Sequence, residues 1–109
     1  MKQAVIYCRV DAPINEFTLT AISAQEDKLR NYAHKNGINI KKCYTDAGSS
    51  AIDEERPGIQ ELIYNMQSES PDFVIVVNRS RLYRGAVPTV LKSLSNKIIS
   101  LSEIALKEI

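Results

Sequence analysis

The chain has 109 residues, the size of one domain, with 44% apolar and 25% charged residues. These values are typical of a folded globular protein and exclude overall disorder. The formal net charge is only +1, which excludes a broadly basic nucleic-acid-binding surface, so any phosphate must meet a local cluster of cations. No apolar run approaches the ~20 residues that span a bilayer, and we expect no membrane partner.

The cysteines and the histidine bear on the cellular compartment and on metal binding. Cys8 and Cys43 both fall in strand-like runs, and we expect no secretion signal, because the apolar run at residues 4–8 is too short for a signal-peptide core. This pattern favours reduced, partly buried thiols in a cytoplasmic protein. His34 is the single histidine and cannot build a metal site by itself. The sequence also lacks the Gly-x-x-x-x-Gly-Lys motif of nucleotide sites, so we predict neither a metal nor another cofactor.

The first half of the chain alternates strand and helix patterns. Residues 4–10 form a short apolar run, which predicts a buried strand. A helix is predicted over 21–36, because Ser23 and Glu26 have the spacing of a capping box and Gly37 suits the position after a helix end. Residues 38–45 begin with strict alternation and predict a second strand.

The second half continues the alternation after a polar loop at 46–50. Pro57 suits the first turn of a helix, whose buried face is marked by apolar residues at helical spacing: Ile59, Leu62, Ile63 and Met66. Residues 73–77 are apolar and β-branched, as in a central parallel strand. A helix is predicted over 88–94, a short fourth strand over 98–101, and a helix start or frayed tail over 104–109.

This order predicts one α/β domain over residues 1–109. We expect three layers, α/β/α, around a mostly parallel sheet of four to five strands. In such sheets the chemistry lies at the carboxyl ends of the strands. Here those ends lead into the segments 9–13, 46–56 and 78–84.

Arginine is concentrated in these segments, whereas the lysines lie elsewhere. Five of the six arginines lie at or just after predicted strand ends or in the loops: Arg9, Arg56, Arg79, Arg81 and Arg84. The planar guanidinium group suits bidentate binding of phosphate or carboxylate. The set predicts one anion site that could stabilise charge on a transferring phosphoryl group. For any single arginine, a solvated surface position is the alternative.

Five short blocks of sequence point to a family. In chain order they are Tyr7-Cys8-Arg9-Val10, Ser23-Ala24-Gln25, Tyr44-Thr45-Asp46-Ala47-Gly48-Ser49, Arg56-Pro57-Gly58-Ile59-Gln60 and Arg81-Leu82-Tyr83-Arg84. In order and spacing they resemble the catalytic domain of the serine recombinases, the resolvase/invertase family, over about residues 3–101. The resemblance implies the resolvase catalytic-domain fold.

It also implies site-specific DNA recombination in a bacterial or phage mobile element, by integration, inversion or resolution. In this family a serine at the end of the first strand attacks a DNA phosphodiester, and strands are exchanged through a 5′-phosphoserine link within a tetramer. No metal or nucleotide cofactor is needed. The resemblance implies that Gln25 orders the nucleophile loop, that Asp46 supports the site, and that the scissile phosphate is bound by Arg9, Arg56, Arg81 and Arg84.

The sequence departs from the family at two site positions. Asp11 stands where the family has its nucleophilic serine, and Ser80 stands where the family has an acid. Three interpretations follow. The site is inactivated and Asp11 pairs with Arg9 or a neighbouring arginine; or Ser80 is a relocated nucleophile oriented by Asp11; or Asp11 mimics the charge of the phosphoserine state.

The length is a further departure. Family members continue into a long dimerisation helix and a separate DNA-binding domain, and neither is expected within these 109 residues. The chain is then an excised catalytic domain or a naturally short relative, a homo-oligomer (dimer or tetramer) in its full-length form, and a weak DNA binder alone.

Three classes of function stay open at this point. They are a DNA-cutting recombinase domain, a recombinase-like module that acts through binding or assembly, and a flavodoxin-like small-anion domain unrelated to DNA. Tyr83, between Arg81 and Arg84, is an alternative nucleophile. For Tyr7, Tyr44 and Tyr83 we favour instead packing with a hydrogen-bonded hydroxyl.

Overall fold

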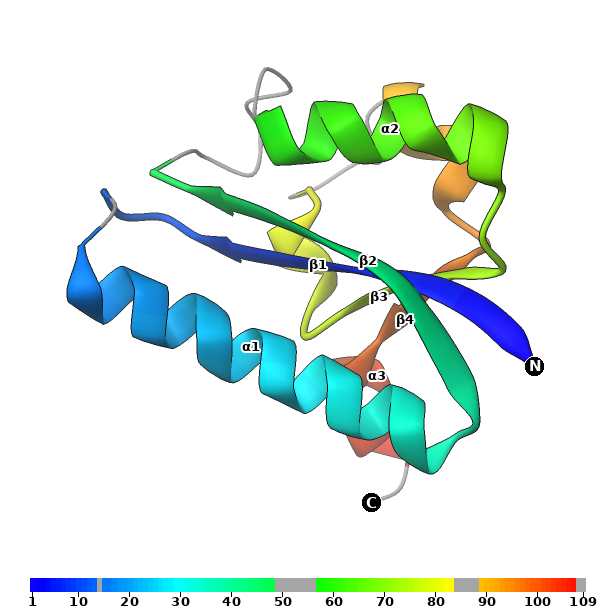
Figure 1. Cartoon of the computed structure of the whole chain (residues 1–109), viewed down its shortest axis with the longest axis horizontal. Coiled ribbons are helices and arrows are strands. Elements are labelled where there is room, and N and C mark those ends of the chain that lie inside the picture. Colours follow the sequence, from blue (N-terminus) through cyan, green and yellow to red (C-terminus); the bar gives the residue numbers. More distant parts are fainter. Residues whose placement is uncertain (14, 49–56, 84–88, 108–109) are drawn as a thin grey trace.

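The computed structural model describes residues 1–13, 15–48, 57–83 and 89–107 (Figure 1). The first three strands and two long helices alternate along the chain: β1 (Lys2–Val10), α1 (Glu16–Lys35), β2 (Ile38–Ala47), α2 (Pro57–Glu69) and β3 (Phe73–Val76). Two short 3-10 helices follow, η1 (Arg79–Arg81) and η2 (Thr89–Leu94). The order ends with β4 (Ile98–Ser100) and α3 (Leu101–Lys107).

The sheet has four strands in the order β2-β1-β3-β4, and every pair is parallel. Helices α1 and α3 cover one face and α2 covers the other, so the predicted three-layer α/β/α fold is confirmed (Figure 1). β1 lies inside the sheet, between β2 and β3. Its carboxyl end lies beside that of β2, where the register places Arg9 opposite Asp46, and extends past the last pairing with β3, at Ile6.

Each face of the sheet has its own apolar core. The core on the α2 side joins Tyr7 of β1 and Leu62 of α2 with residues from η2, among them Leu91. The core on the α1 side joins Ile6 and Cys8 of β1 to Leu29 and other residues of α1. Alternate residues of β1 thus point into opposite cores, and both faces of this strand are buried, as its apolar sequence predicts.

The predicted start of the first helix, residue 21, is wrong by five residues. α1 begins at Glu16, and its N-cap is Asn15, whose side chain accepts hydrogen bonds from the backbone N–H groups of Phe17 and Thr18. The Thr18 hydroxyl accepts the Asn15 N–H at 2.8 Å, which completes a capping box. The Ser23–Glu26 spacing lies inside the helix and caps nothing. At the other end, Gly37 has a φ of 66° and directly follows the C-cap residue, as predicted.

Two predictions in the last third of the chain are also corrected. The helix expected over 88–94 is a 3-10 helix, η2, which begins at Thr89; Pro88 lies outside the described residues. The fourth strand ends at Ser100 and not at residue 101, because α3 begins at Leu101. The final helix accordingly starts three residues earlier than expected.

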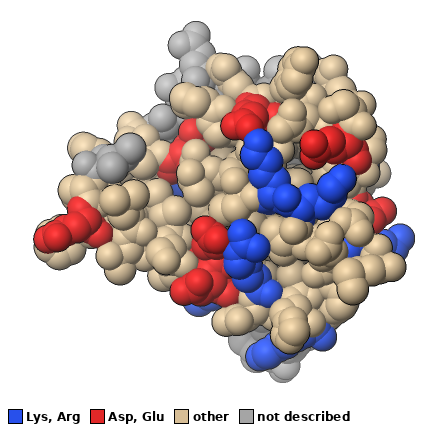
Figure 2. Space-filling view, viewed as in Figure 1, with Lys and Arg blue, Asp and Glu red and all other residues tan. Residues whose placement is uncertain are grey.

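Charges of both signs are interleaved on the surface formed by α1, β2 and α2 (Figure 2). Ion pairs on this side join Arg30 to Glu26 and Lys42 to Glu61. The described basic side chains on this face therefore lie next to acidic ones. Among the described residues, no helix is both long enough and apolar enough to cross a membrane.

Candidate active site at the end of the central strand

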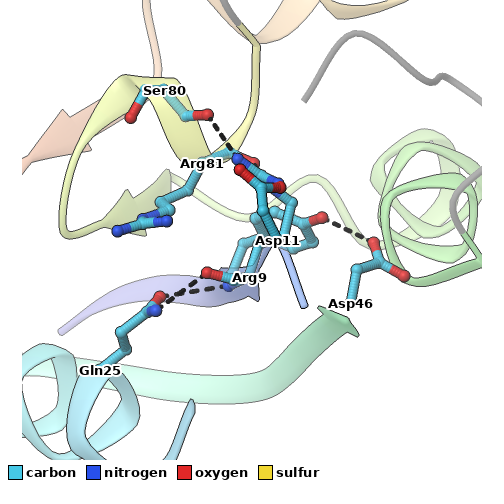
Figure 3. Close-up of polar contacts among 7 residues, drawn as sticks. Arg9, Asp11, Gln25, Asp46, Ser80 and Arg81 are labelled. Carbon is cyan, nitrogen blue, oxygen red and sulfur yellow. Dashed lines mark hydrogen bonds and ion pairs between the residues drawn. The ribbon is translucent and has the colours of Figure 1, made fainter. Parts of the chain in front are cut away.

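Arg9, the next-to-last residue of β1, has a fully buried side chain. Its Nε donates to the backbone carbonyl of Arg81 at 2.9 Å, and one terminal nitrogen donates to the carbonyl of Ser80 at 3.1 Å (Figure 3). The other terminal nitrogen forms an ion pair with Asp11. A buried guanidinium is tolerated only when its donors are satisfied, and here main-chain carbonyls and a carboxylate satisfy them.

Asp11 lies just beyond β1, and its side chain is 39% exposed. Its carboxylate faces Arg9, so an anion already occupies the Arg9 guanidinium (Figure 3). This is the arrangement that the first interpretation of Asp11 requires. Because the Asp11 side chain is partly exposed to solvent, an incoming anion could reach this ion pair.

The side chain of Gln25, in α1, hydrogen-bonds to both the N–H and the carbonyl of Arg9. The side-chain oxygen accepts the Arg9 N–H at 3.1 Å, and the side-chain nitrogen donates to the Arg9 carbonyl at 2.9 Å (Figure 3). The β1–β3 register extends only from Ala4 to Ile6, so the end of β1 needs other partners. The Gln25 carboxamide supplies them and fixes the strand just before Asp11.

Asp46, near the end of β2, binds the first turn of α2. Its two oxygens accept the N–H groups of Gly58 at 2.7 Å and Ile59 at 2.9 Å. The Tyr7 hydroxyl donates to the same carboxylate at 2.6 Å. A negative charge at a helix N-terminus is favourable, so Asp46 caps α2 from a neighbouring strand and joins it to β1.

Gly58 is required by this close approach. A Cβ atom at position 58 would lie 2.4 Å from the Thr45 carbonyl oxygen and 2.9 Å from an Asp46 carboxylate oxygen. No side chain fits at those distances, so glycine lets the start of α2 lie directly on the end of β2.

Ser80 and Arg81 reach the site mainly through their main chains. Asn78, which follows β3, caps the 3-10 helix η1 by accepting the Ser80 N–H at 3.0 Å. This turn directs the Ser80 and Arg81 carbonyls at Arg9. The Ser80 hydroxyl points away from Asp11, and the Arg81 guanidinium lies on the Gln25 side of Arg9 rather than beside Asp11 (Figure 3).

The structure therefore brings together Arg9, Asp11, Gln25, Asp46 and the main chain of η1. Arg56 and Arg84 lie outside the described residues, as do Ser49 and Ser50. Tyr83 is buried, with 9% of its surface exposed. Among the described residues, no group of three or more His, Cys, Asp or Glu side chains could hold a metal ion.

Tyr7 and Tyr44 behave as predicted, with packed rings and hydrogen-bonded hydroxyls. Tyr7 and Tyr44 are buried, and the Tyr44 hydroxyl accepts a hydrogen bond from Asn65. The Tyr7–Asp46 contact is the part of the site that sequence reasoning missed. The sequence held a signal for this contact, because both residues lie near the carboxyl ends of two strands that pair.

Two thiols lie beneath the site on the α1 side. Cys8 is fully buried, and its hydrogen bond with Cys43, together with burial, raises the pKa of the Cys8 thiol. The same hydrogen bond lowers the pKa of Cys43, which also lies 3.6 Å from a Glu26 oxygen. Cys8 is thus an inert core thiol, as expected, and both cysteines are free.

The site is built around Arg9, a buried arginine at the end of a central parallel strand. Gln25 of α1 binds its main chain, and the carbonyls of η1 bind its side chain. These features define an α/β domain with an anion-binding type of site at the ends of its strands. The family model for the resolvase N-terminal domain matches residues 4–107. The chain therefore belongs to the resolvase family, and its fold is that of a serine recombinase catalytic domain.

Several proteins are similar to this chain in structure or in sequence. The N-terminal catalytic domain of TP901-1 integrase is 33% identical, with a TM-score of 0.79 over 94% of this chain and 79% of that one. The C-terminal catalytic domain of ISC1926 TnpA, an IS607-like serine recombinase, is 23% identical, with a TM-score of 0.78 over 97% of this chain and 76% of that one. An uncharacterized immunity region protein 3 of Bacillus phage phi105 is 33% identical over 66 residues, 61% of this chain and 80% of that protein. The family match favours the recombinase interpretation over a flavodoxin-like domain unrelated to DNA.

Proposed function

We propose that this chain acts in site-specific DNA recombination as a recombinase catalytic domain, and that its own site is closed to strand cleavage by Asp11. The observation that carries the proposal is the ion pair between Asp11 and the fully buried Arg9. The recombination role is supported by the chain's membership of the resolvase family and by its similarity to the catalytic domain of an integrase.

Electrostatics explain why Asp11 would close the site. A phosphodiester carries one negative charge and would bind the Arg9 guanidinium at the place that the Asp11 carboxylate holds. To enter, it would have to displace that carboxylate or lie beside it, and two like charges at one site repel each other. Residue 11 also offers no hydroxyl that could form a phosphoserine link.

The relocated-nucleophile interpretation has less support. A serine and its orienting acid should lie about 2.6–3.2 Å apart. The Ser80 hydroxyl points away from Asp11, and the Ser80 contact with Arg9 runs through the carbonyl (Figure 3). We therefore place Ser80 as a structural partner of Arg9.

The proposal is tested by anion binding at Arg9. Inorganic phosphate is titrated into isotope-labelled protein, and the backbone NMR signals of residues 9–12 are followed. In Asp11→Asn the competing charge is lost while the side-chain shape is kept, so phosphate should bind about tenfold more tightly than in the original chain. Equal affinity in the two proteins would show that Asp11 does not occupy an anion site.

Strand cleavage is tested separately by covalent trapping. Duplex fragments taken from both sides of the gene are incubated with the original chain, Asp11→Ser and Asp11→Asn, and covalent protein–DNA products are resolved on denaturing gels. We expect no product from the original chain or from Asp11→Asn, so that only Asp11→Ser can form a phosphoserine link. A covalent product from the original chain would contradict closure by Asp11.

DNA is the partner that follows from the recombination role, and the cytoplasm is the compartment in which a bacterial or phage recombinase meets it. We propose in addition that the protein assembles as a homo-oligomer, dimer or tetramer, because strand exchange joins two DNA sites. Sedimentation of the original chain with and without DNA tests the assembly.

A further inference from the structure

A second cation-lined feature lies next to Arg9, on the α1 side of the sheet. It is a pocket of about 350 Å³ between α1 and the residues that follow β3. Its lining residues come from both segments: Ala24, Gln25, Lys28, Val77, Asn78 and Arg81. Gln25 borders both this pocket and the Arg9 strand end, because the same side chain binds the main chain of Arg9.

Among the lining residues that the structure describes, the charged ones are of one sign. Lys28 and Arg81 are both cations, and none of these described residues carries a carboxylate. The Lys28 side chain forms no ion pair or hydrogen bond with another described residue. Two cations in one cleft repel each other, and the cleft concentrates their field, so an anion between them would be stabilised.

The polar groups of the lining add hydrogen-bond donors. The Asn78 oxygen accepts the Ser80 N–H, and this contact fixes which end of the carboxamide is used. The Asn78 Nδ2 group therefore offers two N–H donors, and no described residue accepts a hydrogen bond from either of them. The Arg81 guanidinium lies toward Gln25 and away from Asp46 (Figure 3). Donors from α1, from Asn78 and from η1 thus border one space.

We propose that this pocket binds phosphate oxygens, as a subsite separate from the anion position that Asp11 occupies. Lys28 is the residue that distinguishes the subsite, since the family resemblance gives it no role. Phosphate of a nucleic-acid backbone and free inorganic phosphate share this chemistry. The assignment to a nucleic-acid backbone rests on the proposed function, whereas affinity for phosphate as such does not.

The test follows the signals of the pocket in isotope-labelled protein. Inorganic phosphate, and in a second arm a short single-stranded oligonucleotide, are titrated while the amide signals of Lys28 and the side-chain NH₂ signals of Asn78 are recorded. We expect saturable shifts in both arms. Shifts with inorganic phosphate alone would support the pocket and assign it to a free anion.

Matched variants localise the binding. Lys28→Gln should weaken the affinity reported by the Asn78 signals about threefold to fivefold, the effect of losing one exposed charge partner. Lys35→Gln, which removes the same charge about 10 Å further along the same helix, should leave it unchanged. Both positions are exposed, so neither variant threatens the fold.

Two results would overturn the proposal: no saturable shift in either arm, or equal weakening in Lys28→Gln and Lys35→Gln. Failure of the pocket is distinct from failure of the proposed function. The Arg9–Asp11 position is reported by other signals, those of residues 9–12, and responds to Asp11→Asn rather than to Lys28→Gln.

Discussion

The carboxylate of Asp46 accepts three hydrogen bonds in a position with only 6% of its surface exposed. Two of the donors belong to the backbone of α2, and the third is the Tyr7 hydroxyl. Hydrogen bonds to a charged group are stronger than those between neutral groups, and a buried acceptor that loses a donor cannot turn to water. Tyr7 is therefore more than an apolar core residue, because it helps to satisfy a buried charge.

Removing the Tyr7 hydroxyl should destabilise the protein measurably. In Tyr7→Phe the ring stays and one donor to Asp46 is lost, so the free energy of unfolding should fall by about 1.5–3 kcal/mol. Urea denaturation followed by circular dichroism measures the change. Tyr64→Phe is the matched control, because Tyr64 is 75% exposed and its change should stay within about 0.5 kcal/mol. Equal effects of the two variants would show that the buried hydroxyl contributes nothing special.

The two cysteines should differ in reactivity. The thiolate is the reacting form; Cys8 is fully buried with a raised pKa, while the pKa of the partly exposed Cys43 is lowered. Near pH 8, a chromogenic disulfide reagent should therefore modify one thiol quickly. Cys43→Ser should abolish the fast phase, and Cys8→Ser should retain it. Two thiols reacting at the same rate in the native protein would contradict this assignment.

At the scale of the elements, the start of α2 makes a close contact with the end of β2, in addition to the apolar packing of its buried face. Its first turn lies against β2 at Thr45 and Asp46, and Gly58 is the residue that permits the approach. Alanine has a better helix propensity than glycine by up to about 1 kcal/mol, so propensity alone predicts that Gly58→Ala stabilises. The steric term is larger here, because the added methyl group would lie 2.4 Å from a backbone oxygen that cannot turn aside.

We expect Gly58→Ala to lower the free energy of unfolding by about 1–3 kcal/mol, the usual cost of overpacking. Thermal and urea denaturation measure it. Gln67→Ala, at an exposed position of the same helix, should change stability by no more than about 0.5 kcal/mol. A Gly58→Ala protein as stable as the original would mean that α2 can move away from β2 at little cost.

The elements also show what the sequence could predict. The strands and α2 follow from apolar runs and helical spacing, because β1, β3 and α2 are buried on the faces that the pattern marks. The start of α1 did not follow, since Asn15 and Thr18 form a capping box of a less common composition and Phe17 and Leu19 in its first turns are exposed. The switch from strand to helix at Leu101 has no turn residue to announce it.

The site could be predicted in part, because the sequence pattern shows where the strands end. Strand ends of a parallel sheet meet at one edge, so the segments 9–13 and 46–56 were expected to lie at the site. Arg9 and Asp46, which belong to these segments, are register partners. Side-chain direction was not predictable. Nothing in the sequence tells that Arg9 points into the protein at the carbonyls of η1 while the Arg81 guanidinium lies on the Gln25 side.

At the scale of the whole molecule, charge distribution would decide how tightly the domain binds DNA in the proposed role. The net charge is +1, and on the face formed by α1, β2 and α2 the basic side chains lie beside acidic ones (Figure 2). Several cations are engaged within the protein: Arg9 with Asp11, Arg30 with Glu26, Lys42 with Glu61 and Arg79 with Glu103. To bind one of these cations, a DNA phosphate must compete with the carboxylate that already pairs with it.

Non-specific affinity for DNA grows with the number of phosphates that a protein neutralises, and log K falls with log salt by about 0.9 for each phosphate on a duplex. A small cluster at the strand ends supplies at most about four such contacts, so the salt slope for this chain should be no steeper than about −4. At about 0.15 M salt we expect a dissociation constant weaker than about 100 µM and no shifted band in a gel assay. Fluorescence anisotropy of a labelled duplex over a salt series measures both quantities. A tight complex that persists at high salt would contradict the prediction, because it would require either many more phosphate contacts or direct reading of bases.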